Sequence, residues 1–339
     1  MNSFERFHNR LHGLPVDRPP NFDIMMTFAA HFIGQPLSRY YLDYRVLAEA
    51  NQAVQQAFDL DLLQAISDPY REASDMGLEV EFPEDGLPVS KKPLVVAPED
   101  LSKVRVPNPS TSRRMSDRLE AIRAMKSHSA GQVPVMGWVE GALAEAADLR
   151  GVNNTFVDLY ERPQWLLDLL EHCVEVEIAF ARLQVEAGAD IIGLGDAVCS
   201  QISPRMYRRF ALPYERRIFD AVHQAGSVAR LHICGNTTRL LPDMAQCGAD
   251  IVDLDWMVGF GQAAEIFGTG PAPCGNFDPV AVMFQGTPDM VYESVRHCLR
   301  VGGARSFVMA GCEIPDGTPH ENLRAQAQAL VEYGGAYGT

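Results

Sequence analysis

The sequence lacks both a long apolar run and an excess of positive charge. No uninterrupted apolar stretch in its 339 residues reaches the roughly 18 residues that a membrane-spanning helix needs. The chain has 29 lysines and arginines against 44 aspartates and glutamates, for a formal net charge of −15. A protein that binds nucleic acid needs a basic surface for the phosphates. We therefore expect neither a nucleic acid nor a membrane as a partner.

Two further features concern the compartment. The first 20 residues, MNSFERFHNRLHGLPVDRPP, mix both charges and lack the apolar centre of a secretory signal peptide, so we expect a cytoplasmic protein. There are only seven cysteines, all of them from Cys173 onward. Their odd number and scattered spacing argue against disulfides. We expect reduced thiols, some of them free to bind a metal.

The chain from residue 133 onward alternates short apolar runs with longer amphipathic stretches, such as residues 165–188 and 204–226. This alternation predicts βα units on a parallel sheet. The predicted strands lie in residues 133–141, 189–196, 227–236, 249–256, 272–276 and 304–312.

The first third is less regular. Residues 21–28 predict a first strand, residues 44–67 a helix and residues 77–98 one or two further short strands. Counting one strand in each of the two strand regions gives eight in total. The best fit is an α/β fold, a (β/α)8 TIM barrel with an N-terminal helical extension, in a single domain over residues 1–339. A doubly wound sheet is the second choice, weakened because no Gly-x-Gly-x-x-Gly follows an early strand.

The stretch RLHICGN, residues 230–236, places a histidine and a cysteine two positions apart in an apolar run. Residues two apart on a strand share a face, so His232 and Cys234 point the same way, with Arg230 below them. Cys312 ends a later strand, and strand ends meet at the mouth of a barrel. One imidazole and two thiolates are zinc ligands, and three ligands with an open position are typical of catalytic zinc. Buried thiols that only pack as small apolar groups are the alternative.

With these residues placed, the chain resembles the uroporphyrinogen decarboxylase superfamily over nearly its whole length, which implies a (β/α)8 barrel. The motifs that carry the resemblance are ERFHNRLHGLPVDRPP, GADIIGLGDAVCSQISPRMYRRFALPY, GADIVDLDWMV, CGNFDPVAVM and GCEIPDGTPHENLRA. Decarboxylases carry an N-terminal arginine-rich motif that holds the propionates of a tetrapyrrole. The corresponding residues 21–38, NFDIMMTFAAHFIGQPLS, contain no arginine.

Another branch of the superfamily is more similar. In cobalamin-dependent methyltransferases, including methylcobalamin:coenzyme M methyltransferases, the residues equivalent to His232, Cys234 and Cys312 bind zinc, which binds and activates an acceptor thiol. The resemblance therefore implies Zn2+ as a cofactor and methylcobalamin or another methylated corrinoid as the methyl donor. Coordination removes the proton of a thiol, and the thiolate attacks the methyl group on Co(III), leaving Co(I).

The partners follow from the same resemblance. A corrinoid-binding module usually carries Asp-x-His-x-x-Gly, and this sequence has none, so we expect the corrinoid on a separate corrinoid protein. The small-molecule methyl acceptor is a thiol such as coenzyme M, or another carrier such as tetrahydrofolate. Two alternatives remain open: decarboxylation of a tetrapyrrole of the uroporphyrinogen type, and a non-catalytic barrel that binds zinc or a corrinoid.

Three acidic residues at strand ends are further candidates. Asp196 stands where the family places an acid on the substrate side, and it could bind the acceptor, hydrogen-bond a zinc ligand or cap the next helix. Asp253 and Asp255, if they point inward, need partners, of which Arg230 is the obvious one. We predict catalytic roles for Asp196 and Asp255, with an internal ion network as the alternative for Asp253 and Asp255.

Four more residues could add a ligand or a substrate contact. Cys274 could be a fourth zinc ligand or lie near the corrinoid, although a buried structural thiol is the simpler interpretation. Glu140 departs from the Gly-Pro-Phe frequent at this place in the superfamily and could be a displaceable zinc ligand. Asn236 and Asn276, each after a glycine, are expected in turns, where their side chains could donate hydrogen bonds toward the ligand.

Overall fold

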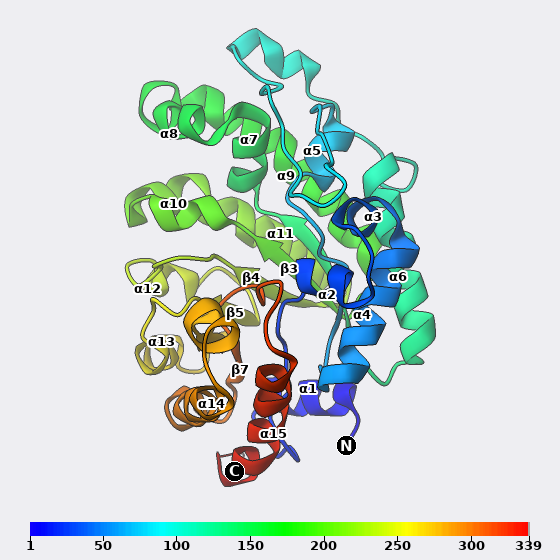
Figure 1. Ribbon diagram of the computed structural model, residues 1–339. Helices are drawn as coiled ribbons and strands as arrows, with labels where there is room; N and C mark the ends of the chain where they lie inside the picture. The colour runs from blue at the N-terminus through cyan, green and yellow to red at the C-terminus, as the bar shows by residue number, and fades with distance from the viewer. Residues whose placement is uncertain (338–339) are drawn as a thin grey trace.

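A parallel sheet that curls into a barrel-like shape, with helices packed around it, organises the chain (Figure 1). The computed structural model describes residues 1–337. Its seven strands follow one another in chain order, each parallel to the next. They are β1 Leu63–Gln64, β2 Val135–Glu140, β3 Ile191–Gly195, β4 Val228–His232, β5 Ile251–Leu254, β6 Ala272–Phe277 and β7 Phe307–Ala310. The six strands predicted from residue 133 onward are confirmed.

Helices connect the strands, and both termini lie at the same end of the molecule (Figure 1). The helices are α1 Ser3–Leu11, α2 Thr27–Phe32, α3 Leu37–Leu42, α4 Tyr44–Phe58, α5 Arg71–Met76, α6 Arg113–Ser129, α7 Ala142–Arg150, α8 Val152–Glu161, α9 Pro163–Glu186, α10 Pro204–Phe210, α11 Leu212–Gln224, α12 Leu241–Met244, α13 Phe260–Phe267, α14 Pro288–Gly302 and α15 His320–Tyr337. Short helical turns cover η1 Pro98–Lys103, η2 Ala197–Gln201 and η3 Pro279–Phe284. The helix predicted over 204–226 is divided in two, because Pro213 in the first turn of α11 has no N–H to continue α10.

The predicted strand over residues 21–28 is wrong, and the described residues form seven strands instead of eight. Residues 27 and 28 belong to α2, and residues 21–25 are buried without forming a strand. Residues 21–25 make only isolated hydrogen bonds to their neighbours. The side chain of Gln64 donates to the Asp23 carbonyl (2.8 Å) and the Ala310 N–H donates to the Asp23 carboxylate (3.0 Å). A side-chain carboxylate thus takes the place that a backbone carbonyl holds in a strand ladder.

The prediction of sheet strands in residues 77–98 is also wrong. Only one antiparallel bridge, between Glu81 and Val89, forms there, because four prolines in this segment remove ladder donors. The first strand is β1, which lies inside the helix predicted over 44–67. Helix α4 ends earlier, at Phe58, because Asp59 adopts a left-handed conformation with φ 52°, which aspartate tolerates at a helix end.

The barrel interior has its own apolar cluster, separate from the layer between sheet and helices. Leu231 and Ile233 belong to the layer between sheet and helices, whereas the interior cluster includes Met136 and Trp138 of β2 and Met309 of β7. The side chains of Phe7 and Leu11 join the interior cluster, so α1 closes the barrel at the amino ends of the strands and packs as part of the barrel. The carboxyl ends remain for ligands.

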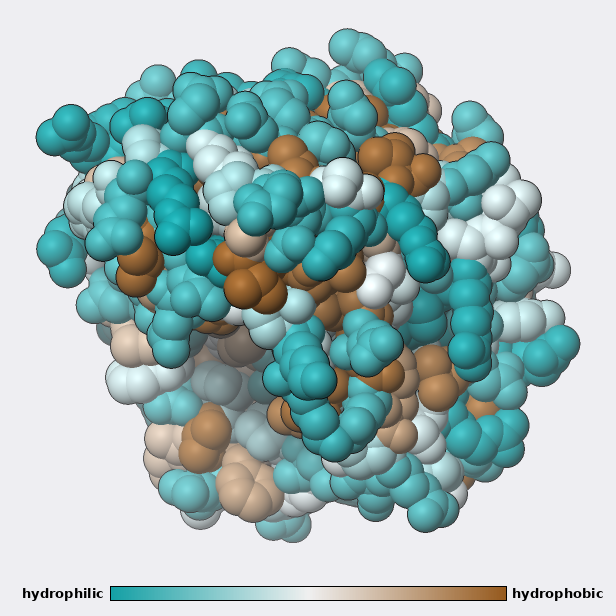
Figure 2. Space-filling view, turned by 90° about the horizontal axis from the view of Figure 1, so that it is seen from above, coloured by the Kyte–Doolittle hydropathy of each residue, from teal (hydrophilic) through white to brown (hydrophobic). Residues whose placement is uncertain are grey.

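Polar residues dominate one face of the molecule (Figure 2). The face seen in Figure 2 is largely hydrophilic, with hydrophobic residues in small separate patches. Among the helices of residues 1–337, none is both long and apolar enough to cross a membrane.

Candidate functional site

Strand register brings the predicted site residues into one layer of the barrel. Glu140, Gly195, His232 and Asp253 pair in sequence across β2, β3, β4 and β5. Residues paired in neighbouring parallel strands point to the same side. His232 is the last residue of β4 and Cys312 follows the end of β7 by two residues, so both belong to the carboxyl ends of the strands.

Asp253 fixes the orientation of His232. The Nδ1 atom of His232 lies 2.9 Å from Oδ2 of Asp253, and Arg230 Nε donates to the same carboxylate at 2.8 and 3.1 Å. The predicted partnership of Arg230 with Asp253 is confirmed. Burial alone would raise the pKa of Asp253, but Arg230 and His232 outweigh it and the pKa lies below its ordinary value. An ionised Asp253 accepts from Nδ1, which leaves Nε2 to face the barrel mouth.

His232 and Cys312 are spaced as two ligands of one metal. The Sγ atom of Cys312 lies 3.7 Å from Nε2 of His232. Typical Zn–N and Zn–S lengths with a tetrahedral angle place such atoms about 3.6 Å apart. Cys234 is next to both residues, and its hydrogen bonds with Cys312 and His232 lower the pKa of its thiol. Burial opposes the imidazolium, but Asp253 and Cys234 raise the pKa of His232 to about 9. A metal that binds here displaces these protons.

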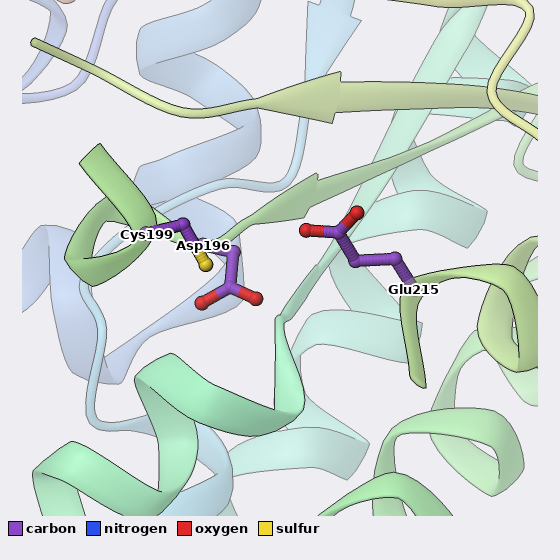
Figure 3. A group of neighbouring side chains, drawn as sticks. All are labelled: Asp196, Cys199 and Glu215. Carbon is purple, nitrogen blue, oxygen red and sulfur yellow. The ribbon is translucent and has the colours of Figure 1, made fainter. Parts of the chain in front are cut away.

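A second, more compact group of candidate ligands lies nearby. Among the described residues, only Asp196, Cys199 and Glu215 form a group of three or more such side chains whose ligand atoms all lie within 4.8 Å of one another. His232, Cys234 and Cys312 do not meet this condition, so at least one of these side chains must move before all three could hold one metal. Figure 3 shows the carboxylate of Glu215 directed toward Asp196 and Cys199. All three side chains of this second group are buried.

Asp196 is one of the three residues of this second group. It does not line the small cavity that opens beside His232. Its Oδ1 accepts a hydrogen bond from the Ala144 N–H at 3.0 Å, in the first turn of α7. Residue 141, at the N-cap of α7, is a glycine without a side chain that could cap the helix. Asp196 thus caps α7 instead of the next helix along the chain. Burial raises the pKa of Asp196 to about 7.

A small cavity opens beside His232 and Cys312. Its volume is about 180 Å³, below the roughly 300–1,000 Å³ of pockets for drug-sized ligands. Its lining residues are Ile24, Met26, Ile66, Asp68, Pro69, Arg71, Trp138, Glu140, Gly195, Ala197, His232, Cys312 and Glu313. Ten of these, including Arg71 and Trp138, are residues that the sequence pattern did not assign to a site. Two of the three predicted metal ligands, His232 and Cys312, line the cavity.

Arg71 and Glu140 form an ion pair in the cavity wall. The Nη2 atom of Arg71 lies 2.9 Å from Oε1 of Glu140, and Trp138 Nε1 donates to the same oxygen at 3.2 Å. Glu140 thus bonds to Arg71 and Trp138. Burial raises the pKa of Glu140 to about 8, against the lowering effect of Arg71. Arg71 follows β1 by a few residues, so recognising that strand would have pointed to it.

The remaining candidates do not line the cavity beside His232. Asp255 is buried, and its carboxylate accepts hydrogen bonds from the N–H groups of Gly235 and Trp256, each at 2.6 Å. It thus stabilises the loops that follow β4 and β5. The side chain of Asn276 donates to the Asp255 and Val258 carbonyls. Cys274 and Asn236 are placed differently again. Cys274 lies inside the barrel, 3.9 Å from Arg230 Nη2, and Asn236 is exposed in a turn where its Oδ1 accepts from the Thr238 N–H.

Comparison with known proteins identifies the family. The sequence model of the uroporphyrinogen decarboxylase (URO-D) family matches residues 2–333. The match spans nearly the whole chain, and the protein belongs to this family.

Individual relatives fall in two groups. The chain is 28% identical to the methylcobamide:CoM methyltransferase MtbA of Methanosarcina mazei, covering 97% of each protein. It is 29% identical to a uroporphyrinogen decarboxylase of Streptomyces avermitilis, over 88% of this chain and 83% of the relative. Among solved structures, a methyltransferase from Methanosarcina mazei superposes with a TM-score of 0.90 at 26% identity, over 98% of this chain and 99% of that one. The resemblance to methyltransferases stated from the sequence is confirmed, and so is a TIM-barrel-like fold.

Proposed function

We propose that this protein transfers a methyl group from a methylated corrinoid to a small thiol that binds beside His232 and Cys312. The observation that carries the proposal is the 3.7 Å approach of Cys312 Sγ to His232 Nε2 at the mouth of the barrel, next to a cavity of about 180 Å³. The methylcobamide:CoM methyltransferases of similar length support the same reaction class.

His232, Cys234 and Cys312 would hold a zinc ion. Their donor set of one imidazole and two thiols is a zinc set, and the spacing of His232 and Cys312 fits a shared tetrahedral ion. Zinc bound there would lower the pKa of a thiol at its open position, so that the thiol binds as a thiolate. Asp253 holds His232 in place, as ligand-orienting carboxylates do in metal sites.

The chain's own residues would bind and orient the acceptor. Trp138 supplies an apolar wall of the cavity, and Arg71 with Glu140 a polar one. In the transfer the S–C bond forms and the Co–C bond breaks. The electron pair of the broken bond stays on the corrinoid, whose cobalt passes from Co(III) to Co(I), and the thiol proton leaves to solvent. Because no Asp-x-His-x-x-Gly occurs in the chain, the corrinoid arrives on a separate protein.

Two observations count against the alternatives. A tetrapyrrole with several carboxylates needs a large basic pocket, whereas this cavity is small and Arg71 is the one lysine or arginine among its described lining residues. A closed zinc site completed by Cys274 is disfavoured, because that thiol lies beside Arg230 in the barrel interior. A carrier as large as a tetrahydrofolate also exceeds the cavity, which favours a small thiol as acceptor.

The test follows the absorbance of free methylcobalamin with zinc-loaded protein and 2-mercaptoethanol. Loss of the cobalt–methyl band, with formation of the methyl thioether detected by mass spectrometry, is the expected result. His232→Ala should reduce the rate by at least about 100-fold, since a catalytic metal site that loses a ligand loses its metal. Equal rates for His232→Ala and the unaltered protein would contradict the proposal.

A further inference from the structure

The charges around the cavity bear on which thiol it accepts. Recognition of a sulfonate, carboxylate or phosphate normally uses an arginine or lysine with free N–H donors. Arg71 is the one such residue among the described lining residues. Whether the cavity can take an anionic acceptor therefore depends on how far Arg71 is already engaged.

Arg71 is engaged on every accessible side. Its Nη2 contacts Glu140 at 2.9 Å and Glu72 at 3.4 Å, and its Nη1 donates to the carbonyl of Asp68. The side chain is 1% exposed, and its remaining Nε–H is buried. A buried guanidinium requires an ionised partner, and either of the two glutamates supplies it. The charge of Arg71 is compensated whichever of them is ionised.

The other lining groups supply no uncompensated positive charge. As a zinc ligand His232 is a neutral imidazole, and the thiolates of Cys234 and Cys312 would balance the charge of the zinc. Asp68 is paired with Arg114, whose Nη2 lies 2.7 Å away and which does not line the cavity. Glu313 accepts hydrogen bonds from the backbone and hydroxyl of Thr27, and within the described residues it has no lysine or arginine partner. An anionic head group would thus enter a small space that already holds carboxyl groups and no free cation.

We propose that the cavity selects a small thiol whose end remote from sulfur is uncharged or positively charged, with the Arg71–Glu140 pair as the determinant. This inference rests on the proposed function for the identity of the ligand as a thiol. It distinguishes this chain from its relatives named for coenzyme M, whose acceptor is a thiol with a sulfonate. Replacing Glu140 would remove the nearer of the two glutamates, leaving Glu72 at 3.4 Å as the remaining glutamate partner of Arg71, and would let the guanidinium meet the anion.

Three thiols with the same two-carbon chain test the proposal: 2-mercaptoethanol, 2-aminoethanethiol and 2-mercaptoethanesulfonate. Their affinities for zinc-loaded protein are measured by calorimetry. We expect the sulfonate to bind at least about ten-fold more weakly than the hydroxyl compound, as one unfavourable charge contact in a partly buried site implies. At pH 9, above the pKa of about 8 of Glu140, Glu140→Gln should narrow this gap by strengthening sulfonate binding. Glu81→Gln removes the same charge from an exposed pair with Lys91 and should leave the gap unchanged.

Each outcome decides the matter. The proposal is overturned if the sulfonate binds as tightly as the neutral thiol, if Glu140→Gln leaves the gap unchanged, or if no thiol of the series binds. Methyl transfer from methylcobalamin is measured in parallel. The expected ranking without transfer would contradict the proposed function alone, whereas transfer with a preference for the sulfonate would contradict only the charge selection.

Discussion

The imidazole of His232 and the carboxylate of Asp253 meet at 2.9 Å, between the last residue of β4 and its registered partner in β5. This contact turns Nε2 of His232 toward Cys312. It also links the proposed metal site to Arg230, which is fully buried in the barrel interior. The same carboxylate thus orients one proposed ligand and neutralises an internal cation.

Replacing Asp253 with asparagine should weaken both the orientation of His232 and the neutralisation of Arg230. We expect zinc affinity to fall about 10–100-fold, because a ligand-orienting partner is lost. The free energy of unfolding should fall by about 3–5 kcal/mol, because Arg230 is left buried without its counter-charge. Chelator competition measures the first and urea denaturation the second. Adding Arg230→Met to Asp253→Asn should restore part of the stability but none of the zinc affinity. If Asp253→Asn alone left the zinc affinity unchanged, Asp253 would not orient His232 for zinc.

Gly141 leaves room for Asp196 to cap α7. A Cβ added at Gly141 would lie 2.4 Å from Cγ of Asp196, so Gly141→Ala must displace either the carboxylate or the start of the helix. We expect a loss of about 1–3 kcal/mol in the free energy of unfolding, measured by urea denaturation. In Asp196→Ala, which costs about 1 kcal/mol for the lost cap, the added Gly141→Ala should cost much less. Additive effects of the two substitutions would refute the steric link.

The ionisation of Asp196 predicts a pH dependence of stability. Burial raises its pKa from an ordinary 3.8 to about 7, so between these values the folded protein holds a proton that the unfolded chain has released. Stability therefore falls as the pH rises through this window, by up to about 4 kcal/mol for a shift of about three pKa units. Asp196→Asn removes this contribution and should flatten the decline between pH 4 and 7. Parallel profiles for the variant and the unaltered protein, measured by urea denaturation, would show that Asp196 does not titrate in this way.

The indole of Trp138 depends on two glycines of β3. A Cβ at Gly193 would lie 2.3 Å from Trp138 Cε3, and one at Gly195 would lie 3.0 Å from its Cζ2. We expect Gly193→Ala to push the indole out of place, to lower stability by about 1–3 kcal/mol and to weaken binding of 2-mercaptoethanol several-fold. Gly259→Ala, where an added Cβ would meet its nearest neighbour at 3.5 Å, is the control. If calorimetry shows unchanged thiol affinity in Gly193→Ala, Trp138 is not part of the acceptor pocket.

The sequence was a good guide where one pattern dominated. Strands β2 to β7 are buried runs between long amphipathic stretches, and the alternation of facing residues placed Arg230 and His232 inside and Leu231 outside. The same reasoning failed for β1. Its two residues come soon after α4: residues 59–62 separate the two elements, and the left-handed Asp59 ends the helix.

Because β1 was not predicted from the sequence, part of the candidate site was not predicted either. Arg71 belongs to the connection after this strand and meets Glu140 only through the folded barrel. Around Asp23 the opposite error occurred, and a strand was predicted where none forms. Residues 21–28 have a strand-like pattern, but the Asp23 side chain replaces the backbone as hydrogen-bond acceptor. Contacts of this kind depend on side-chain placement between distant segments, which no local period records.

The account is tested most directly by zinc analysis, using mass spectrometry on protein purified without added metal. We predict about one zinc per chain in the unaltered protein and in Cys199→Ala, and loss of the metal in both Cys234→Ala and Cys312→Ala. This pattern would assign the metal to His232, Cys234 and Cys312. Zinc that persists in Cys234→Ala and Cys312→Ala but disappears in Cys199→Ala would place the metal in the group of Asp196, Cys199 and Glu215 and contradict thiol activation at the barrel mouth.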